Sequence, residues 1–237
     1  MIDLTSRTAL VTGASRGIGA AVARALAAAR VNLGLVSRSG DDLGIENAVA
    51  IAADVRDSVA MRAAAATTAE RFGGIDIVVI NAGVGSYGPF LDLPEDELED
   101  MIDVNVKGAI YTARAALPYL IDSDAGDLVM LASVAGLHGL PFEAVYCSSK
   151  FAQVGLTRAL DHELREQGVR CTTVAPGGVA TDFAMGRGRT PEMPELDGMM
   201  SAEDFDAGIR ALYRSAQDDG VFCYTFFKAV GVRATKS

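Results

Sequence analysis

The chain has only three cysteines and two histidines among its 237 residues. An odd number of cysteines without paired spacing fits free thiols in a reducing compartment, and it matches neither a disulfide framework nor a zinc site. Two histidines are also too few for a His-rich metal centre. We therefore expect no bound metal. Because the amino terminus carries no basic segment followed by an apolar one, we also expect a cytoplasmic protein.

The sequence also lacks long apolar runs and an excess of positive charge. Charged residues such as Arg24, Arg30 and Asp76 interrupt the apolar segments before any of them reaches the roughly 18 residues of a membrane span. A formal net charge of −10 repels both nucleic acid and anionic membrane surfaces. We therefore expect a soluble protein whose partners include neither nucleic acid nor membrane.

Apolar segments without polar alternation recur along the chain, as expected of parallel strands that are buried on both faces. We predict such strands at residues 8–11, 31–36, 48–53, 75–80, 127–132, 169–175 and 221–230. Helices are predicted at residues 17–29, 58–72, 94–120, 144–167 and 201–216, with Ser58 as a cap and a turn at 40–44 where a further helix is absent. This alternation predicts a single α/β domain, with a Rossmann-like doubly wound parallel sheet of about seven strands.

Tyr146 and Lys150 are four residues apart in the predicted helix 144–167, so their side chains lie on one helix face. An ammonium close to a phenol favours the phenolate and lowers the tyrosine pKa from its usual value of about 10, towards the range of a general acid or base. The spacing alone is weak support for catalysis, because a half-buried tyrosine beside a surface lysine shares it.

A glycine-rich stretch connects the first predicted strand to the first predicted helix. The free N–H groups at the start of such a helix can receive a phosphate. By analogy with the dinucleotide-binding fingerprint, Gly13 permits the tight turn, Gly17 lets the backbone approach a pyrophosphate, and Gly19 allows close helix–strand packing. The alternative is a flexible turn before an alanine-rich helix.

Further motifs follow in a fixed order. The stretch Thr12-Gly13-Ala14-Ser15-Arg16-Gly17-Ile18-Gly19 precedes Asn81-Ala82-Gly83, a single Asn105, Ser133 thirteen residues before Tyr146, and Pro176-Gly177. In this order and at this spacing the motifs resemble the short-chain dehydrogenase/reductase family, from about Arg7 to Thr181. The resemblance implies hydride transfer between NADP(H) and a small-molecule carbonyl or alcohol substrate, in a homodimer or homotetramer.

The resemblance also assigns roles to individual residues. Tyr146 would donate the proton, Ser133 would stabilise the developing charge, Lys150 would hold the nicotinamide ribose, and Asn105 would hold a water that connects Lys150 with solvent. The expected cofactor-binding residues are Gly13, Ser15, Arg16, Gly17, Ile18, Gly19, Ser37, Arg38, Asp54, Val55, Asn81, Ala82, Gly83, Tyr146, Lys150, Pro176, Gly177, Val179 and Thr181. The simpler alternatives are that Asn105 bonds to local backbone and that Ser133 caps a strand end.

The end of the second predicted strand bears on the choice of cofactor. An NAD enzyme places an acidic residue there to bind the ribose hydroxyls, whereas this chain has Ser37 and Arg38. Arg38 and Arg16 are therefore expected to bind the 2′-phosphate of NADP(H). The alternative is that Arg38 faces solvent and that Asp41 or Asp42 binds an unphosphorylated ribose.

Residues 182–200 contain four methionines and the basic pair Arg187 and Arg189, and they predict a substrate-covering lid that attracts an anionic substrate or the cofactor phosphates. The alternatives are that the segment is a disordered surface loop and that the arginine pair serves only solubility. The terminal segment has Phe226-Phe227-Lys228 where relatives have an Asp-Gly-Gly turn, which puts its subunit contacts in doubt.

The motifs do not separate a 3-oxoacyl-thioester (acyl carrier protein) reductase, a sugar or polyol dehydrogenase and a steroid or quinone reductase, and a non-catalytic NADP-binding regulator is a further alternative.

Overall fold

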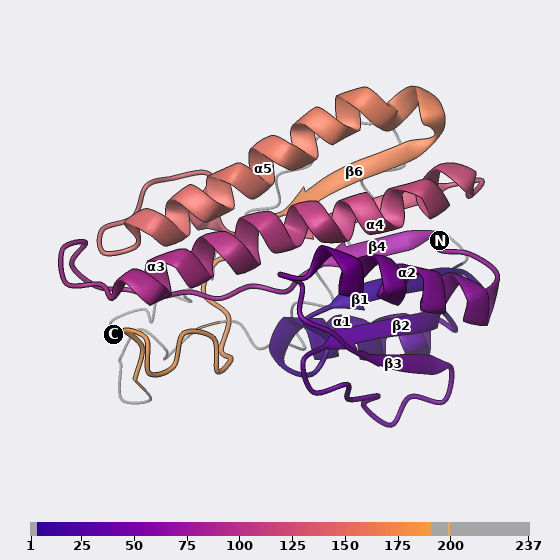
Figure 1. The fold of residues 1–237 in the computed structure, drawn as a ribbon, viewed down its shortest axis with the longest axis horizontal. Coiled ribbons are helices and arrows are strands. Elements are labelled where there is room, and N and C mark those ends of the chain that lie inside the picture. The colour runs from indigo at the N-terminus through magenta and orange to yellow at the C-terminus, as the bar shows by residue number, and fades with distance from the viewer. Residues whose placement is uncertain (1–3, 191–198, 200–237) are drawn as a thin grey trace, which may run out of the picture.

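The computed structural model describes residues 4–190 and residue 199, in which strands alternate with helices (Figure 1). The strands are β1 (Thr8–Thr12), β2 (Asn32–Ser37), β3 (Ala48–Ala52), β4 (Ile77–Ile80), β5 (Gly126–Leu131) and β6 (Val169–Val174). The α-helices are α1 (Gly17–Ala28), α2 (Ser58–Phe72), α3 (Glu95–Ile102), α4 (Gly108–Asp122) and α5 (Ala144–Leu164), and the short turns are η1 (Asp103–Lys107), η2 (Val134–Gly136) and η3 (Arg165–Gln167). The predicted helix 201–216 and the predicted strand 221–230 lie outside the described residues.

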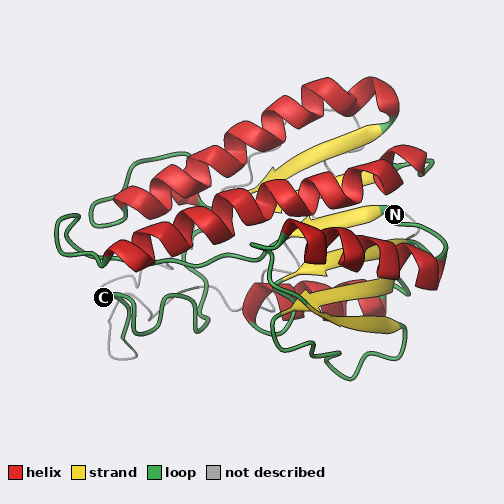
Figure 2. Ribbon diagram, in the orientation of Figure 1, coloured by secondary structure: helices red, strands yellow, loops and turns green. Residues whose placement is uncertain are grey.

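The strands of the described chain form one parallel sheet of six, in the order β3-β2-β1-β4-β5-β6 (Figure 2). The order reverses between β1 and β4, which are hydrogen-bonded neighbours. At such a switch point the connections that follow the two strands run to opposite faces, and this opens a crevice at the carboxyl edge of the sheet. The predicted Rossmann-like doubly wound fold is confirmed.

Helices cover both faces of this sheet. On one face α2, α4 and α5 pack against the strands, and α1 lies behind the other face (Figure 2). The apolar side chains therefore form two clusters, one containing Met61, Leu120 and Leu128 and the other containing Leu26 and Leu33. None of the helices in the described part of the chain combines the length and the apolar character that a membrane crossing requires.

Two predicted helices differ in detail. The cap of α2 is Asp57 and not Ser58, because the Asp57 carboxylate accepts hydrogen bonds from the N–H groups of Val59 and Ala60 at 2.7 and 3.0 Å. The helix predicted for residues 94–120 is interrupted by η1, a π-helical turn that contains Asn105. A π-helical turn inserts extra backbone into a helix, so it changes where the side chains of that turn are directed. Residues 38–47 form turns without a helix, as predicted.

Candidate active site

A cleft of about 470 Å³ lies at the carboxyl edge of the sheet, beside the β1–β4 switch point. Nearly every residue that the sequence assigned to catalysis or cofactor binding lines it: Gly13, Ser15, Arg16, Gly17, Ile18, Ser37, Arg38, Asp54, Val55, Asn81, Ala82, Gly83, Ser133, Tyr146, Lys150, Pro176, Gly177, Val179 and Thr181. The two exceptions, Gly19 and Asn105, are buried directly behind the lining.

The glycine stretch forms a tight loop between β1 and α1. Gly13 and Gly17 have φ angles of +66° and +55°, in the left-handed region that favours glycine. A Cβ on Gly19 would lie 2.2 Å from the Gly13 carbonyl oxygen, so the helix approaches the loop more closely than any other residue would allow. No side chain caps the first turn of α1, which leaves its N–H groups available to a phosphate. The loop thus has the shape that a dinucleotide requires.

Asn81 fastens this loop to the neighbouring strand. Its side-chain amide donates hydrogen bonds to the carbonyls of Thr12 and Gly13 at 2.9 and 3.1 Å. The Thr12 hydroxyl in turn accepts from the backbone N–H groups of Asn81 and Ala82 at 3.1 and 3.2 Å. Asn81 therefore supports the glycine loop with its side chain, and it also lines the cleft together with Ala82 and Gly83.

Ser133, Tyr146 and Lys150 converge on the other half of the cleft. Ser133 follows the end of β5, and its hydroxyl accepts a hydrogen bond from the Ala135 N–H at 3.1 Å. Tyr146 is buried, and its ring meets the Tyr87 ring edge-to-face with 5.5 Å between the ring centroids. The Lys150 ammonium lies 5.7 Å from the centroid of the Tyr146 ring. The predicted pairing of tyrosine and lysine on one helix face is therefore present.

The expected effect of this pairing on the pKa of Tyr146 was wrong. Burial raises the pKa of Tyr146 to about 12, although the nearby Ser133 hydroxyl acts in the opposite direction. Burial also lowers the pKa of Lys150 to about 7. The reason is that both groups lose hydration together, so the lysine charge that would favour a phenolate is itself disfavoured.

Asn105 in the π-helical turn has a fully engaged side chain. Its carbonyl oxygen accepts a hydrogen bond from the Val84 N–H at 2.8 Å, and its amide nitrogen donates to the Val84 carbonyl at 2.8 Å and to the Ser149 hydroxyl at 2.9 Å. The Asn105 backbone carbonyl accepts from the side-chain amide of Gln153 at 2.8 Å. The side chain thus binds the backbone of the loop after β4 and Ser149 of α5, and not the backbone of its own turn. The backbone carbonyl is bound by Gln153, which is itself a partner of Lys150.

Two arginines, Arg38 and Arg56, line the part of the cleft that lies beyond the end of β2. Arg38 is exposed at the rim. Asp54 forms an ion pair with Arg56 at 2.7 Å, and hydrogen bonding from Arg56 lowers the pKa of Asp54. Asp41 and Asp42, the acids considered as ribose ligands, instead accept hydrogen bonds from Leu43 and Gly44 within their own turn, and neither lines the cleft.

Comparison with known proteins adds to this geometry. Residues 7–192 match the model of a family described as short chain dehydrogenases. The chain belongs to the short chain dehydrogenase family. It is 41% identical to the oxidoreductase UcpA of Salmonella typhimurium over 206 residues, which span 82% of this chain and 78% of UcpA.

The chain is also similar to solved structures of dehydrogenases. An alcohol dehydrogenase from Thermococcus sibiricus, complexed with 5-hydroxy-NADP, has a TM-score of 0.83 and 31% identity, covering 94% of this chain and 97% of that one. A short chain dehydrogenase/reductase from Burkholderia phymatum, complexed with NAD, has a TM-score of 0.79 and 28% identity, covering 90% and 88%. As a short chain dehydrogenase, the chain is an oxidoreductase of a family that binds nicotinamide cofactors.

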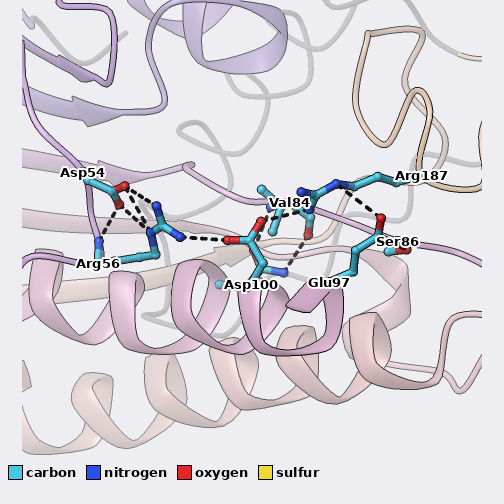
Figure 3. A network of polar contacts seen from close by, with 8 residues as sticks. Asp54, Arg56, Val84, Ser86, Glu97, Asp100 and Arg187 are labelled. Carbon is cyan, nitrogen blue, oxygen red and sulfur yellow. Dashed lines mark hydrogen bonds and ion pairs between the residues drawn. The ribbon is translucent and has the colours of Figure 1, made fainter. Parts of the chain in front are cut away.

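In this dehydrogenase a polar network joins Asp54 and Arg56 in the cleft to Arg187 in the segment after β6 (Figure 3). Arg56 donates to one carboxylate oxygen of Asp100 at 3.0 Å, and Arg187 donates to the other at 2.9 Å. Arg187 also approaches Glu97, and Glu97 accepts a hydrogen bond from Ser86. Two carboxylates of α3 therefore offset the positive charge of Arg187. The sequence showed Arg187 and Arg189 as one basic pair and did not indicate this difference between them.

Arg189 has different surroundings and lines the cleft. Its guanidinium lies 5.5 Å from the centroid of the Tyr87 ring and donates to the Phe183 carbonyl at 3.3 Å. Tyr87 and Phe183 both contact the Tyr146 ring, and the sequence analysis missed both of them. Tyr87 lies in the loop that follows β4, and this position at the carboxyl edge is the signal by which it could have been found.

Proposed function

We propose that this chain interconverts a carbonyl and an alcohol, with NADP(H) as the hydride carrier and Tyr146 as the proton donor for reduction. The observation that carries the proposal is that Ser133, Tyr146 and Lys150 line one cleft together with the glycine loop. The nicotinamide, when bound, gives hydride to the carbonyl carbon or takes it from the alcohol.

The residues of the chain support the proton side of this chemistry. The high pKa of Tyr146, about 12, keeps its hydroxyl protonated at neutral pH, as a proton donor must be before reaction. Ser133 presents a second hydroxyl at the same end of the cleft, where it donates to the oxygen that gains negative charge. Lys150, behind both, stabilises the phenolate that remains after proton transfer and holds the ribose hydroxyls of the cofactor.

The proposal is tested by mixing the purified protein with NADPH and a panel of carbonyl compounds, and by following NADPH absorbance. Oxidation of NADPH that depends on one class of compound would support catalysis. A 3-oxoacyl-thioester reductase would respond to 3-oxoacyl thioesters more strongly than to simple ketones and sugars. Tight NADPH binding without oxidation by any compound would instead favour the non-catalytic regulator.

We further propose a preference for NADP(H) over NAD(H), supported by Arg38 at the cleft rim and by the neutralisation of Asp54 by Arg56. Because a charge-assisted hydrogen bond contributes about 1.5–3 kcal/mol, Arg38→Asp should weaken NADPH binding by at least tenfold and leave NADH binding equal or improved. Titration of both cofactors against both proteins measures this.

The matched control for this prediction is Arg24→Asp, which places the same charge change on the exposed surface of α1. It should leave both affinities close to those of the wild type. Wild-type protein that binds NADH as tightly as NADPH would refute the preference, and so would an Arg38→Asp variant with unchanged selectivity.

On the substrate side, we propose that residues 182–190 form part of a cover in which Arg189 attracts an anionic group. Arg189 lines the cleft beside Tyr87, whereas Arg187 is bound to α3. Glu143 lies in the same part of the cleft, and burial raises its pKa, so its repulsion of an anion decreases at acid pH.

Arg189→Ala should therefore raise the KM of carboxylate-bearing substrates by about tenfold or more and leave the KM of neutral substrates unchanged. Arg187→Ala is the comparison, because loss of its bonds to α3 loosens the segment for every substrate alike. Steady-state kinetics on matched charged and neutral carbonyl compounds separates the two. Equal effects of Arg189→Ala on both substrate classes would remove Arg189 from anion recognition.

A further inference from the structure

Gln153 lies one helical turn beyond Lys150, on the face of α5 that points into the protein. It is 1% exposed, although glutamine is rarely buried this completely without polar partners. Its side-chain oxygen accepts a hydrogen bond from the Lys150 ammonium at 2.9 Å. Its side-chain nitrogen donates to the backbone carbonyl of Asn105 at 2.8 Å. Both ends of the amide are therefore satisfied by groups that border the cleft.

This orientation of the amide is the one that the chemistry permits. An ammonium only donates hydrogen bonds and a carbonyl only accepts them. Reversing the amide would set an N–H against the Lys150 ammonium and an oxygen against the Asn105 carbonyl. Gln153 is thus held in one orientation, and it connects Lys150 to η1 through side-chain atoms.

Lys150 uses two of its three N–H groups away from the reacting atoms. One is donated to Gln153 and one to the Leu131 carbonyl at the end of β5, at 3.0 Å. Among the described residues the third N–H group has no hydrogen-bond acceptor, and it is therefore available to a molecule in the cleft that Lys150 lines. Two fixed acceptors therefore determine where the remaining donor points.

The groups that face Lys150 carry little charge. Tyr146 is the titratable neighbour on α5. β5 contributes the Leu131 carbonyl, and within the described residues the nearby groups of η1 and of the loop after β4 are amides and carbonyls at Asn105 and Gly83. None of the ion pairs among the described residues involves Lys150, so its ammonium has only the hydrogen bonds to Gln153 and Leu131, and burial lowers its pKa to about 7.

We propose that Gln153 is a positioning residue, which holds Lys150 in its charged form and directs its remaining N–H group into the cleft. This role rests on the function proposed above. The family resemblance implies that Asn105 holds a water that connects Lys150 with solvent, and it says nothing of a side chain that joins Lys150 to the Asn105 carbonyl, as Gln153 does in this chain. Gln153 acts through Lys150 and touches none of the reacting atoms.

Two nearly isosteric variants test this role because they should change the pH profile in opposite directions. Reduction requires a charged Lys150, so turnover should fall as pH rises through the pKa of that lysine. Gln153→Met removes an acceptor from the ammonium and should move this decline by about one to two pH units to lower pH. Gln153→Glu places a carboxylate beside the ammonium and should move it to higher pH. Gln167→Met, at an exposed glutamine, is the control and should keep the wild-type profile.

A second readout needs no activity. The pKa of Lys150 is about 7 in the folded protein against an ordinary value of 10.5, so the unfolded chain binds more protons between these values and stability rises with pH there. Relative to wild type, Gln153→Met should lose further stability as pH falls from about 8 to 5, because its folded pKa is lower still. Gln153→Glu should lose less stability than the wild type as pH falls from about 8 to 7, because the added carboxylate raises the folded pKa of Lys150. Urea midpoints at several pH values measure both trends.

The outcomes separate the two proposals. Opposite shifts of the two variants in both readouts support the positioning role. Shifts in the same direction, or a uniform loss of turnover at every pH, would overturn it and leave Gln153 as a packing residue. Opposite stability trends without turnover by any protein, wild type included, would support the link to Lys150 and remove the proposed function.

Discussion

Replacement of Tyr146 with phenylalanine should lower turnover by about 10² or more, the usual effect of removing a general acid. The ring keeps its contacts with Tyr87 and Phe183, so the fold and the shape of the cleft are retained. The hydroxyl that donates the proton is lost. Because the glycine loop and Arg38 are untouched, cofactor affinity should stay within a few-fold of the wild-type value.

Tyr119→Phe is the matched control, since it removes a hydroxyl from a half-buried tyrosine on α4 that does not line the cleft. Its turnover should equal that of the wild type. Steady-state kinetics on the best substrate, with cofactor titrations on all three proteins, makes the comparison. If Tyr146→Phe kept turnover within a factor of a few, Tyr146 would not be the proton donor.

Gly19→Ala should have the largest effect on cofactor binding. The added Cβ would lie 2.2 Å from the Gly13 carbonyl oxygen and 2.5 Å from the Asn81 side-chain nitrogen. The loop must move to relieve this overlap, and Asn81 is the residue that holds the loop in place. Overpacking of this kind costs about 1–3 kcal/mol, so cofactor affinity should fall by about tenfold to a hundredfold and the urea midpoint should decrease.

Gly155→Ala provides the contrast, because its Cβ would meet nothing within 4 Å on the exposed side of α5. Alanine is the better helix former by about 0.5–1 kcal/mol, so this variant should be slightly more stable and bind cofactor normally. Normal cofactor affinity in Gly19→Ala would show that the loop tolerates displacement, and the close packing assigned to Gly19 would be wrong.

The sequence predicted the fold and most of the cleft because its signals are local. Apolar runs without alternation mark buried parallel strands, and parallel strands bring their carboxyl ends to one edge. Gly13, Ser133 and Pro176 therefore line the same cleft although they are far apart in the chain. The turn at 40–44 was likewise predictable, because the segment is too short for another helix and strand.

Features that depend on tertiary contacts were not predictable in this way. The π-helical turn at Asn105 has no evident local sequence signal, and the surrounding contacts with Val84 and Ser149 fix its side chain. The pairing of Arg187 with Asp100 joins segments 87 residues apart. The pKa of Tyr146 depends on burial, which no spacing reveals. Gln153 lies three residues after Lys150, but only its burial shows that the two side chains are partners.

Transfer of deuterium from NADPH labelled at the reactive C4 position tests the central claim most directly. The wild-type protein is incubated with the labelled cofactor and a panel of aldehydes, ketones and 3-oxoacyl thioesters, and the products are analysed by mass spectrometry. The account predicts at least one alcohol product that carries deuterium on its carbinol carbon, with Tyr146→Phe forming far less of it. Binding of the labelled cofactor without deuterium transfer to any compound would contradict the account.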